Sequence, residues 1–136
     1  MSLIEIVRAV QTSDETLALT QTLSERCGKT TVVVQDRQGF VTTRALAALL
    51  TEAMRMLEEG VASPEDIDTA IKLGLNHPMG PLELADYIGL DTMLFISESM
   101  TEGVGERFRP TQGLRKLVEA GRLGRKSGHG FYEYEG

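Results

Sequence analysis

The sequence of 136 residues lacks several features, and each absence excludes a class of protein. The single cysteine, Cys27, cannot form an internal disulfide or a cysteine-based zinc site; it fits a reducing cytoplasm, and we expect it in the core. No apolar run approaches the roughly 20 residues that a membrane-spanning helix needs. Lys and Arg number 14 against 20 Asp and Glu, and this net charge of −6 argues against a general binder of nucleic acid. We therefore expect a soluble cytoplasmic protein with neither a membrane nor a nucleic acid as its partner.

The usual signatures of phosphate, hydrolase and metal sites are missing as well. Gly103-Val104-Gly105-Glu106-Arg107-Phe108 imitates the first half of a dinucleotide fingerprint, but the third glycine is absent and a helical pattern precedes it. Neither a Gly-x-x-x-x-Gly-Lys-Ser/Thr loop nor a Gly-x-Ser-x-Gly elbow occurs. The two histidines, His77 and His129, lie far apart in the sequence, which argues against a metal site.

The first 35 residues carry a β-α-β pattern. Apolar and β-branched residues fill positions 3–10, interrupted only by Glu5 and Arg8, and predict a mostly buried strand. Hydroxyl and carboxylate residues at positions 12–15 and Gly28 predict a helix over residues 13–27. The run of Thr and Val at positions 30–34 predicts a second strand, because β-branched side chains crowd a helix.

From residue 39 onward the pattern is helical. Apolar residues at positions 46–57 recur at i, i+3, i+4 and i+7 and predict an amphipathic helix over residues 41–59. Ser63-Pro64 predicts the start of another helix, over residues 63–74. Further helices are expected from about Pro81, from Asp91 and around Leu114, before a glycine-rich C-terminal loop. The fold class is therefore mainly α, and the pattern changes near residue 39.

Two residues have both a structural and a functional interpretation. His77 lies in a loop fixed by proline and glycine, where it either forms a turn or lines a substrate pocket. Glu5 interrupts an apolar strand, and a buried carboxylate there would suit a histidine that acts as general base. The local pattern alone favours the alternative, that Glu5 faces solvent on an edge strand.

A series of collinear segments resembles the C-terminal part of the NAD-dependent 3-hydroxyacyl-CoA dehydrogenase family, including the bacterial 3-hydroxybutyryl-CoA dehydrogenases. Each segment is weakly specific by itself, whereas the ordered series is highly specific. The main segments are Leu3-Ile4-Glu5-Ile6-Val7, Gly39-Phe40-Val41-Thr42-Thr43-Arg44, His77-Pro78-Met79-Gly80-Pro81 and Gly124-Arg125-Lys126-Ser127-Gly128-His129-Gly130-Phe131-Tyr132.

The resemblance implies a two-domain enzyme that oxidises the 3-hydroxyl of an acyl-CoA substrate with NAD. Residues 1–38 would be the last β-α-β edge of its Rossmann domain, and residues 39–136 its helical substrate and dimerisation domain. Glu5 falls on the glutamate that pairs with the catalytic histidine, and Thr43 falls where many members place a substrate-binding asparagine. His77, Pro78 and Met79 resemble the segment lining the acyl side of the cleft. NAD is expected in the full-length enzyme and none on this chain, which we expect to be inactive alone.

Two functional hypotheses remain open. The first is a part of such a dehydrogenase that supplies dimerisation and a portion of the substrate cleft. The second is a stand-alone helical module that dimerises or binds acyl-CoA without catalysis. In either case we expect a homodimer through the face containing Leu46, Leu49, Leu50 and Leu57 and the helix over residues 93–100, because these offer more apolar surface than one small domain needs.

Overall fold

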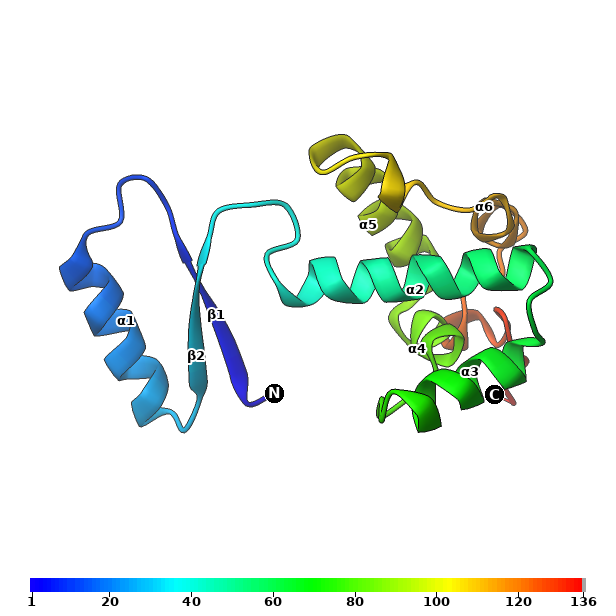
Figure 1. Ribbon diagram of the computed structural model, residues 1–136, viewed down its shortest axis with the longest axis horizontal. Coiled ribbons are helices and arrows are strands. Elements are labelled where there is room, and N and C mark those ends of the chain that lie inside the picture. The colour runs from blue at the N-terminus through cyan, green and yellow to red at the C-terminus, as the bar shows by residue number, and fades with distance from the viewer. Residues whose placement is uncertain (136) are drawn as a thin grey trace. The chain divides into compact units, whose positions relative to one another are not determined.

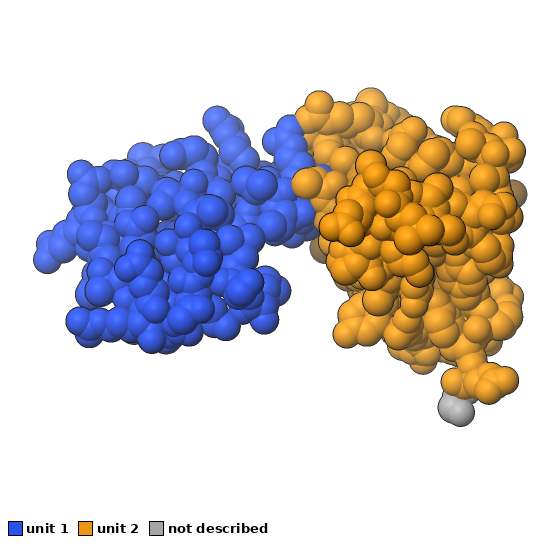
Figure 2. All heavy atoms as spheres, turned by 60° about the horizontal axis from the view of Figure 1, so that its bottom comes forward, with its two compact units in different colours: residues 1–44 blue, residues 45–136 orange. Residues whose placement is uncertain are grey.

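The computed structural model describes residues 1–135 and divides the chain into two compact units, residues 1–44 and 45–136 (Figure 2). The first unit holds strand β1 (Leu3–Arg8), helix α1 (Asp14–Arg26) and strand β2 (Thr30–Gln35), in that order (Figure 1). The strands pair in parallel, from Leu3 opposite Thr30 to Arg8 opposite Gln35. The hydroxyl of Ser13 accepts a hydrogen bond of 3.1 Å from the Thr16 amide and caps α1. The predicted β-α-β module is therefore present.

The first strand is less buried than its sequence predicts. In the two strands only Ile6 and Val34 are buried, and Val10 is fully exposed beyond the end of β1. A parallel sheet is normally covered on both faces, whereas one helix and two strands leave much of this sheet uncovered. The prediction that Cys27 lies in the core is also wrong, because Cys27 is exposed at the C-terminal cap of α1, beyond the reach of this small core.

The second unit is built from helices. Its first helix begins at Thr42, three residues before the unit itself. Helix α2 (Thr42–Glu58) is followed by α3 (Pro64–Gly74), α4 (Pro81–Ile88), α5 (Leu90–Gly103) and α6 (Gln112–Glu119), with short 3-10 turns at Glu106–Phe108 and Arg125–Ser127 (Figure 1). Ser63 caps α3 by accepting a hydrogen bond of 3.1 Å from the Asp66 amide, as the sequence signal predicts. The main core draws on five helices, through Leu50, Ala53, Met54, Ile67, Leu82, Ala85, Leu90, Met93 and Leu114. A mainly α fold that follows a short β-α-β segment is confirmed.

The apolar face that was expected to form a dimer is largely covered within the unit. Leu50, Met93 and Met100 are at most 2% exposed and pack in the unit's own core. Leu46 and Leu57 are partly buried against the same core. These leucines and methionines therefore help to form the unit's own core, because helical periodicity marks an apolar face without saying what covers it, and the homodimer stays a prediction.

No helix among residues 1–135 is long and apolar enough to cross a membrane. The same residues contain no cluster of three or more histidine, cysteine, aspartate or glutamate side chains suited to hold a metal ion.

Candidate functional site

Glu5 reaches from β1 to the first turn of α2. Its Oε1 accepts hydrogen bonds from the backbone amides of Val41, at 2.9 Å, and Thr42, at 3.2 Å. Its Oε2 accepts a short hydrogen bond from the Thr42 hydroxyl. The first amides of a helix have no partner within the helix and carry its positive dipole end, so they bind a carboxylate well. Glu5 is therefore a partly buried cap of α2, and its contacts differ from those of a carboxylate that only faces solvent.

These hydrogen bonds set the charge of Glu5. The hydroxyl of Thr42 lowers the pKa of the Glu5 carboxyl, the backbone amides of Val41 and Thr42 lower this pKa further, and partial burial opposes them. The carboxyl is consequently ionised at neutral pH. An ionised carboxylate only accepts hydrogen bonds, so Glu5 can orient and stabilise a cationic neighbour but has no proton to give.

Thr43, the predicted substrate contact, follows Thr42 directly in the first turn of α2 and is exposed. The structure thus brings Glu5 against the first turn of α2, which also carries Thr43. The partner of Glu5 lies 36 and 37 positions downstream, at Val41 and Thr42, which the local pattern around Glu5 does not reveal.

The segment from His77 to Met79 forms a separate loop between α3 and α4. Nδ1 of His77 lies 2.7 Å from the Met79 carbonyl oxygen. Since a carbonyl only accepts, Nδ1 is assigned the proton, and Nε2 is left as the free acceptor. His77 and Met79 are partly buried and Pro78 is exposed. The loop is thus held by a hydrogen bond of its own, and Nε2 of His77 remains available as an acceptor.

A buried carboxylate fixes the end of this loop. Asp68 of α3 accepts hydrogen bonds from the amides of Leu82, at 2.7 Å, and Glu83, at 2.9 Å, and so caps α4. It also accepts a hydrogen bond of 2.8 Å from the Tyr132 hydroxyl. A Cβ on Gly80 would overlap the Asp68 carboxyl, so only glycine fits there. The glycine of the His77–Pro81 segment is explained by Asp68, which the sequence pattern did not single out.

A second buried carboxylate, Asp86 of α4, organises the C-terminal loop. It accepts hydrogen bonds from the amides of Phe131, at 3.0 Å, and Tyr132, at 2.9 Å, and from the Tyr134 hydroxyl, at 3.0 Å. A Cβ on Gly130 would overlap its carboxyl oxygens. Burial raises the pKa of Asp86 above its usual value, against the opposing effect of these donors. Burial and the bond to Asp86 raise the pKa of Tyr134 to about 12. The contacts give this loop a structural role.

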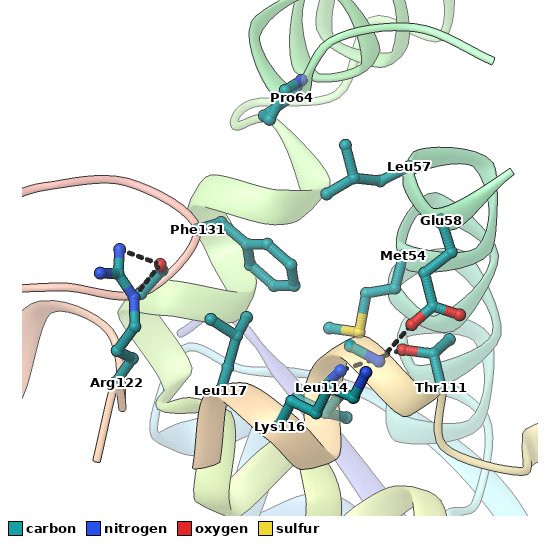
Figure 3. Close-up of a pocket in the computed structure, with 12 residues that line it drawn as sticks. Met54, Leu57, Glu58, Pro64, Thr111, Leu114, Lys116, Leu117, Arg122 and Phe131 are labelled. Carbon is teal, nitrogen blue, oxygen red and sulfur yellow. Dashed lines mark hydrogen bonds between the residues drawn. The ribbon is translucent and has the colours of Figure 1, made fainter. Parts of the chain in front are cut away.

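The second unit also contains a largely apolar cavity of about 460 Å³, which the sequence did not predict (Figure 3). Figure 3 shows Phe131, Leu117 and Met54 around the same space, with Glu58 beside the start of α6. Glu58 accepts a short hydrogen bond from the Gly113 amide and caps α6. None of the predicted substrate residues lines this cavity. Met54, Leu57, Leu114 and Leu117 in its walls are among the apolar positions that marked helices, so the sequence carried no separate signal for it.

Two family models together match nearly the whole chain. Residues 39–134 match the model described as "3-hydroxyacyl-CoA dehydrogenase, C-terminal domain", and residues 1–37 match "3-hydroxyacyl-CoA dehydrogenase, NAD binding domain". The chain belongs to the 3-hydroxyacyl-CoA dehydrogenase family. The family suggested by the collinear sequence segments is therefore confirmed.

Individual members of the family agree with this assignment. A Deinococcus radiodurans protein named probable 3-hydroxybutyryl-CoA dehydrogenase is 53% identical over 135 residues, which cover 98% of this chain and 49% of that protein. Human hydroxyacyl-coenzyme A dehydrogenase, mitochondrial, is 44% identical over 137 residues, covering 99% of this chain and 44% of that protein. The crystal structure of (S)-3-hydroxybutyryl-CoA dehydrogenase from Ralstonia eutropha matches with a TM-score of 0.96 and 47% identity, over 100% of this chain and 48% of that one. This chain spans about half the length of the curated relatives it matches.

The residues that match the family's NAD-binding model do not fit the pyrophosphate of NAD. The connection from β1 to α1, residues 9–13, contains no glycine. The first turn of α1 carries Asp14 and Glu15, whose negative charges would repel a phosphate at that helix end. A dinucleotide cradle needs a glycine-rich turn that opens on a free helix N-terminus. The connection from β1 to α1 therefore does not fit a pyrophosphate.

Proposed function

We propose that this chain forms the helical half, with one sheet edge, of an NAD-dependent 3-hydroxyacyl-CoA dehydrogenase that converts 3-hydroxyacyl-CoA to 3-oxoacyl-CoA. The observation that carries the proposal is the consecutive match of two family models, the NAD-binding domain over residues 1–37 and the C-terminal domain over residues 39–134. The names of the relatives from Deinococcus radiodurans and Ralstonia eutropha favour a short-chain 3-hydroxyacyl-CoA as the substrate. The cytoplasmic location stays a prediction.

In this proposal the residues of the chain prepare the site for the substrate. Glu5, whose ionised form is stabilised by the Thr42 hydroxyl, would orient the catalytic histidine and stabilise its cationic form. Thr43 would contact the reacting oxygen of the substrate; its hydroxyl offers one donor and an acceptor oxygen, in place of the separate NH₂ and C=O of an asparagine. His77, Pro78 and Met79 would form a wall on the acyl side, held in shape by the bond from His77 to the Met79 carbonyl.

A homodimer is the second element of the proposal, through the exposed side of α5, a helix that the sequence already assigned to the dimer contact, together with α4. Phe95 on α5 is 74% exposed and Tyr87 on α4 is 63% exposed, and large exposed aromatic side chains are typical of interface positions. The partner we infer is a second copy of the chain, by the symmetry common in soluble oligomers. Sedimentation should give a dimer for the unchanged chain and a monomer for Phe95→Glu. A monomer of the unchanged chain at micromolar concentration would overturn this element.

The catalytic element is tested by a chimera in which this chain replaces the matching 48% of the Ralstonia eutropha enzyme. The chimera should form NADH from 3-hydroxybutyryl-CoA, whereas this chain alone should form none above a control without protein. Glu5→Gln in the chimera should lower kcat by about 100-fold, because a neutral amide cannot stabilise a cationic histidine. A folded chimera without turnover would overturn the proposal. Binding of acyl-CoA by this chain in that case would favour a non-catalytic module.

A further inference from the structure

The Glu5 carboxylate has an uneven set of partners on its two oxygens. Oε1 accepts hydrogen bonds from the backbone amides of Val41 and Thr42, while the one donor to Oε2 among residues 1–135 is the Thr42 hydroxyl. Each carboxylate oxygen has two lone-pair positions. Oε1 is therefore fully used by the start of α2, and the remaining lone pair of the carboxylate lies on Oε2, beside Thr42.

We propose that Thr42 is a positioning residue of the dehydrogenase, whose hydroxyl holds Glu5 so that a single lone pair, on Oε2, is left to receive the N–H of the catalytic histidine. This inference rests on the proposed function, in which Glu5 pairs with that histidine. The two backbone amides bind Oε1 whatever side chain stands at position 42. The hydroxyl alone binds the second oxygen, Oε2. The residue type at position 42 therefore decides the orientation of the Glu5 carboxylate.

The charged groups near Glu5 do not offer another explanation for its state. The pKa of Glu5 is lowered by the Thr42 hydroxyl first and by the two backbone amides, and partial burial raises it; no charged side chain contributes. On the same strand, Arg8 pairs with Asp14. Arg44, in the first turn of α2, is not among the causes of the shift. Removal of the hydroxyl should therefore change the orientation of the carboxylate and raise its pKa.

The first test uses this chain and needs no activity. Glu5 is followed by carbon-13 NMR of its side-chain carboxyl during a pH titration, in the unchanged chain and in three variants. Thr42→Val keeps the shape and both backbone amides, and the Glu5 titration should move to higher pH. Thr42→Ser keeps a hydroxyl and should titrate like the unchanged chain. Thr43→Val, a matched change at the adjacent threonine, should leave the Glu5 titration in place. Far-UV circular dichroism confirms that each variant is folded.

The second test measures the reaction in the chimera with the Ralstonia eutropha half. Thr42→Val should lower kcat about tenfold, as for the loss of one hydrogen bond to a charged group, with little change in KM. The acidic limb of the pH profile should move to higher pH, since Glu5 is protonated more readily, and Thr42→Ser should restore both. Thr22 lies in α1, and its hydroxyl donates a hydrogen bond to the Ala18 carbonyl. Thr22→Val is therefore the control that should leave kcat unchanged.

The outcomes separate the two proposals. An unchanged Glu5 titration in Thr42→Val overturns the hold of Thr42 on Glu5, whatever the enzyme does. An active chimera whose Thr42→Val variant keeps its kcat and pH profile overturns the positioning role. A folded but inactive unchanged chimera overturns the proposed dehydrogenase function and with it the positioning role, while the titration in the chain still decides the contact itself.

Discussion

The two units differ in how they cover their apolar side chains. In residues 1–44, Leu19 and Leu23 of α1 are 69% and 61% exposed, and two strands and one helix bury few apolar residues. In residues 45–136, a nine-residue cluster packs from five helices, and the carboxylates of Asp68 and Asp86 bind backbone amides 14 to 46 positions away. The second unit is thus closed by a core drawn from five helices, while the first is held by one parallel pair of strands and a single helix.

The open surface of the first unit agrees with the proposed function. Parallel sheets occur almost entirely with both faces covered, and contiguous exposed apolar surface marks a place where another part packs. Val32 and Val33, neighbours on β2 that point to opposite faces, are 39% and 43% exposed. In the proposed enzyme, the rest of the NAD-binding domain would cover this surface. The comparison predicts that core mutations act strongly in unit 2 and weakly in unit 1.

The largest difference is expected between two leucine truncations. Leu50→Ala, at a side chain with no exposed surface, should lower the free energy of unfolding by about 4 kcal/mol, from lost burial and the cavity left behind. Leu23→Ala in unit 1 should cost less than about 0.5 kcal/mol, because the side chain is already in water. Urea unfolding followed by circular dichroism measures both. Equal costs for the two variants would refute the contrast between the units.

The next effect is expected at Asp86. Asp86→Ala leaves the Phe131 and Tyr132 amides and the Tyr134 hydroxyl without their acceptor, and should cost about 3 kcal/mol. Tyr134→Phe removes one donor and should cost about 1 kcal/mol. Proteolysis should also cut the C-terminal loop faster in Asp86→Ala. If the loop stays protected, its order does not depend on this carboxylate.

A smaller effect is expected at Gly80, where the Asp68 carboxyl leaves no room for a side chain. Gly80→Ala should lower the free energy of unfolding by about 2 kcal/mol, since either Asp68 or the loop must shift. Gly74→Ala is the matched control: a Cβ there meets nothing within 4 Å and neither glycine has a positive φ. Thermal unfolding of the two variants compares them. A Gly80→Ala variant as stable as Gly74→Ala would show that Asp68 yields at little cost.

The sequence predicted the features that depend on neighbours along the chain. The hydroxyl and carboxylate residues at positions 12–15 and the Ser63-Pro64 signal placed two helix starts to within one residue, because a capping side chain acts on an amide three residues away. The partners of Glu5 and Asp86 lie tens of residues downstream, and no local pattern encodes such distances. The site residues could therefore be predicted only from their resemblance to a family. The hydrogen bonds that hold those residues became known only from the three-dimensional structure.

The smallest effect concerns pH, where the two units should respond in opposite directions. The pKa of Glu5 is lowered in the folded chain, first by the Thr42 hydroxyl, so its contribution to stability is present above the usual value near 4.5 and is lost as pH falls through the lowered pKa. Burial raises the pKa of Asp86, so its contribution is present below the usual value near 3.8 and is lost as pH rises through the raised pKa.

Amide hydrogen exchange resolves this difference, because it reports each unit separately. Between pH 6 and pH 3, protection in β1 and the first turn of α2 should fall once the intrinsic pH dependence of exchange is removed. Protection of the Phe131 and Tyr132 amides should instead rise, because the contribution of Asp86 to stability increases as its carboxyl takes up a proton. Glu5→Gln should flatten the response of unit 1 and leave that of unit 2 unchanged. A response of unit 1 that persists in Glu5→Gln would mean that another carboxyl controls it, and the link between Thr42 and Glu5 would then not govern the acid stability of this unit.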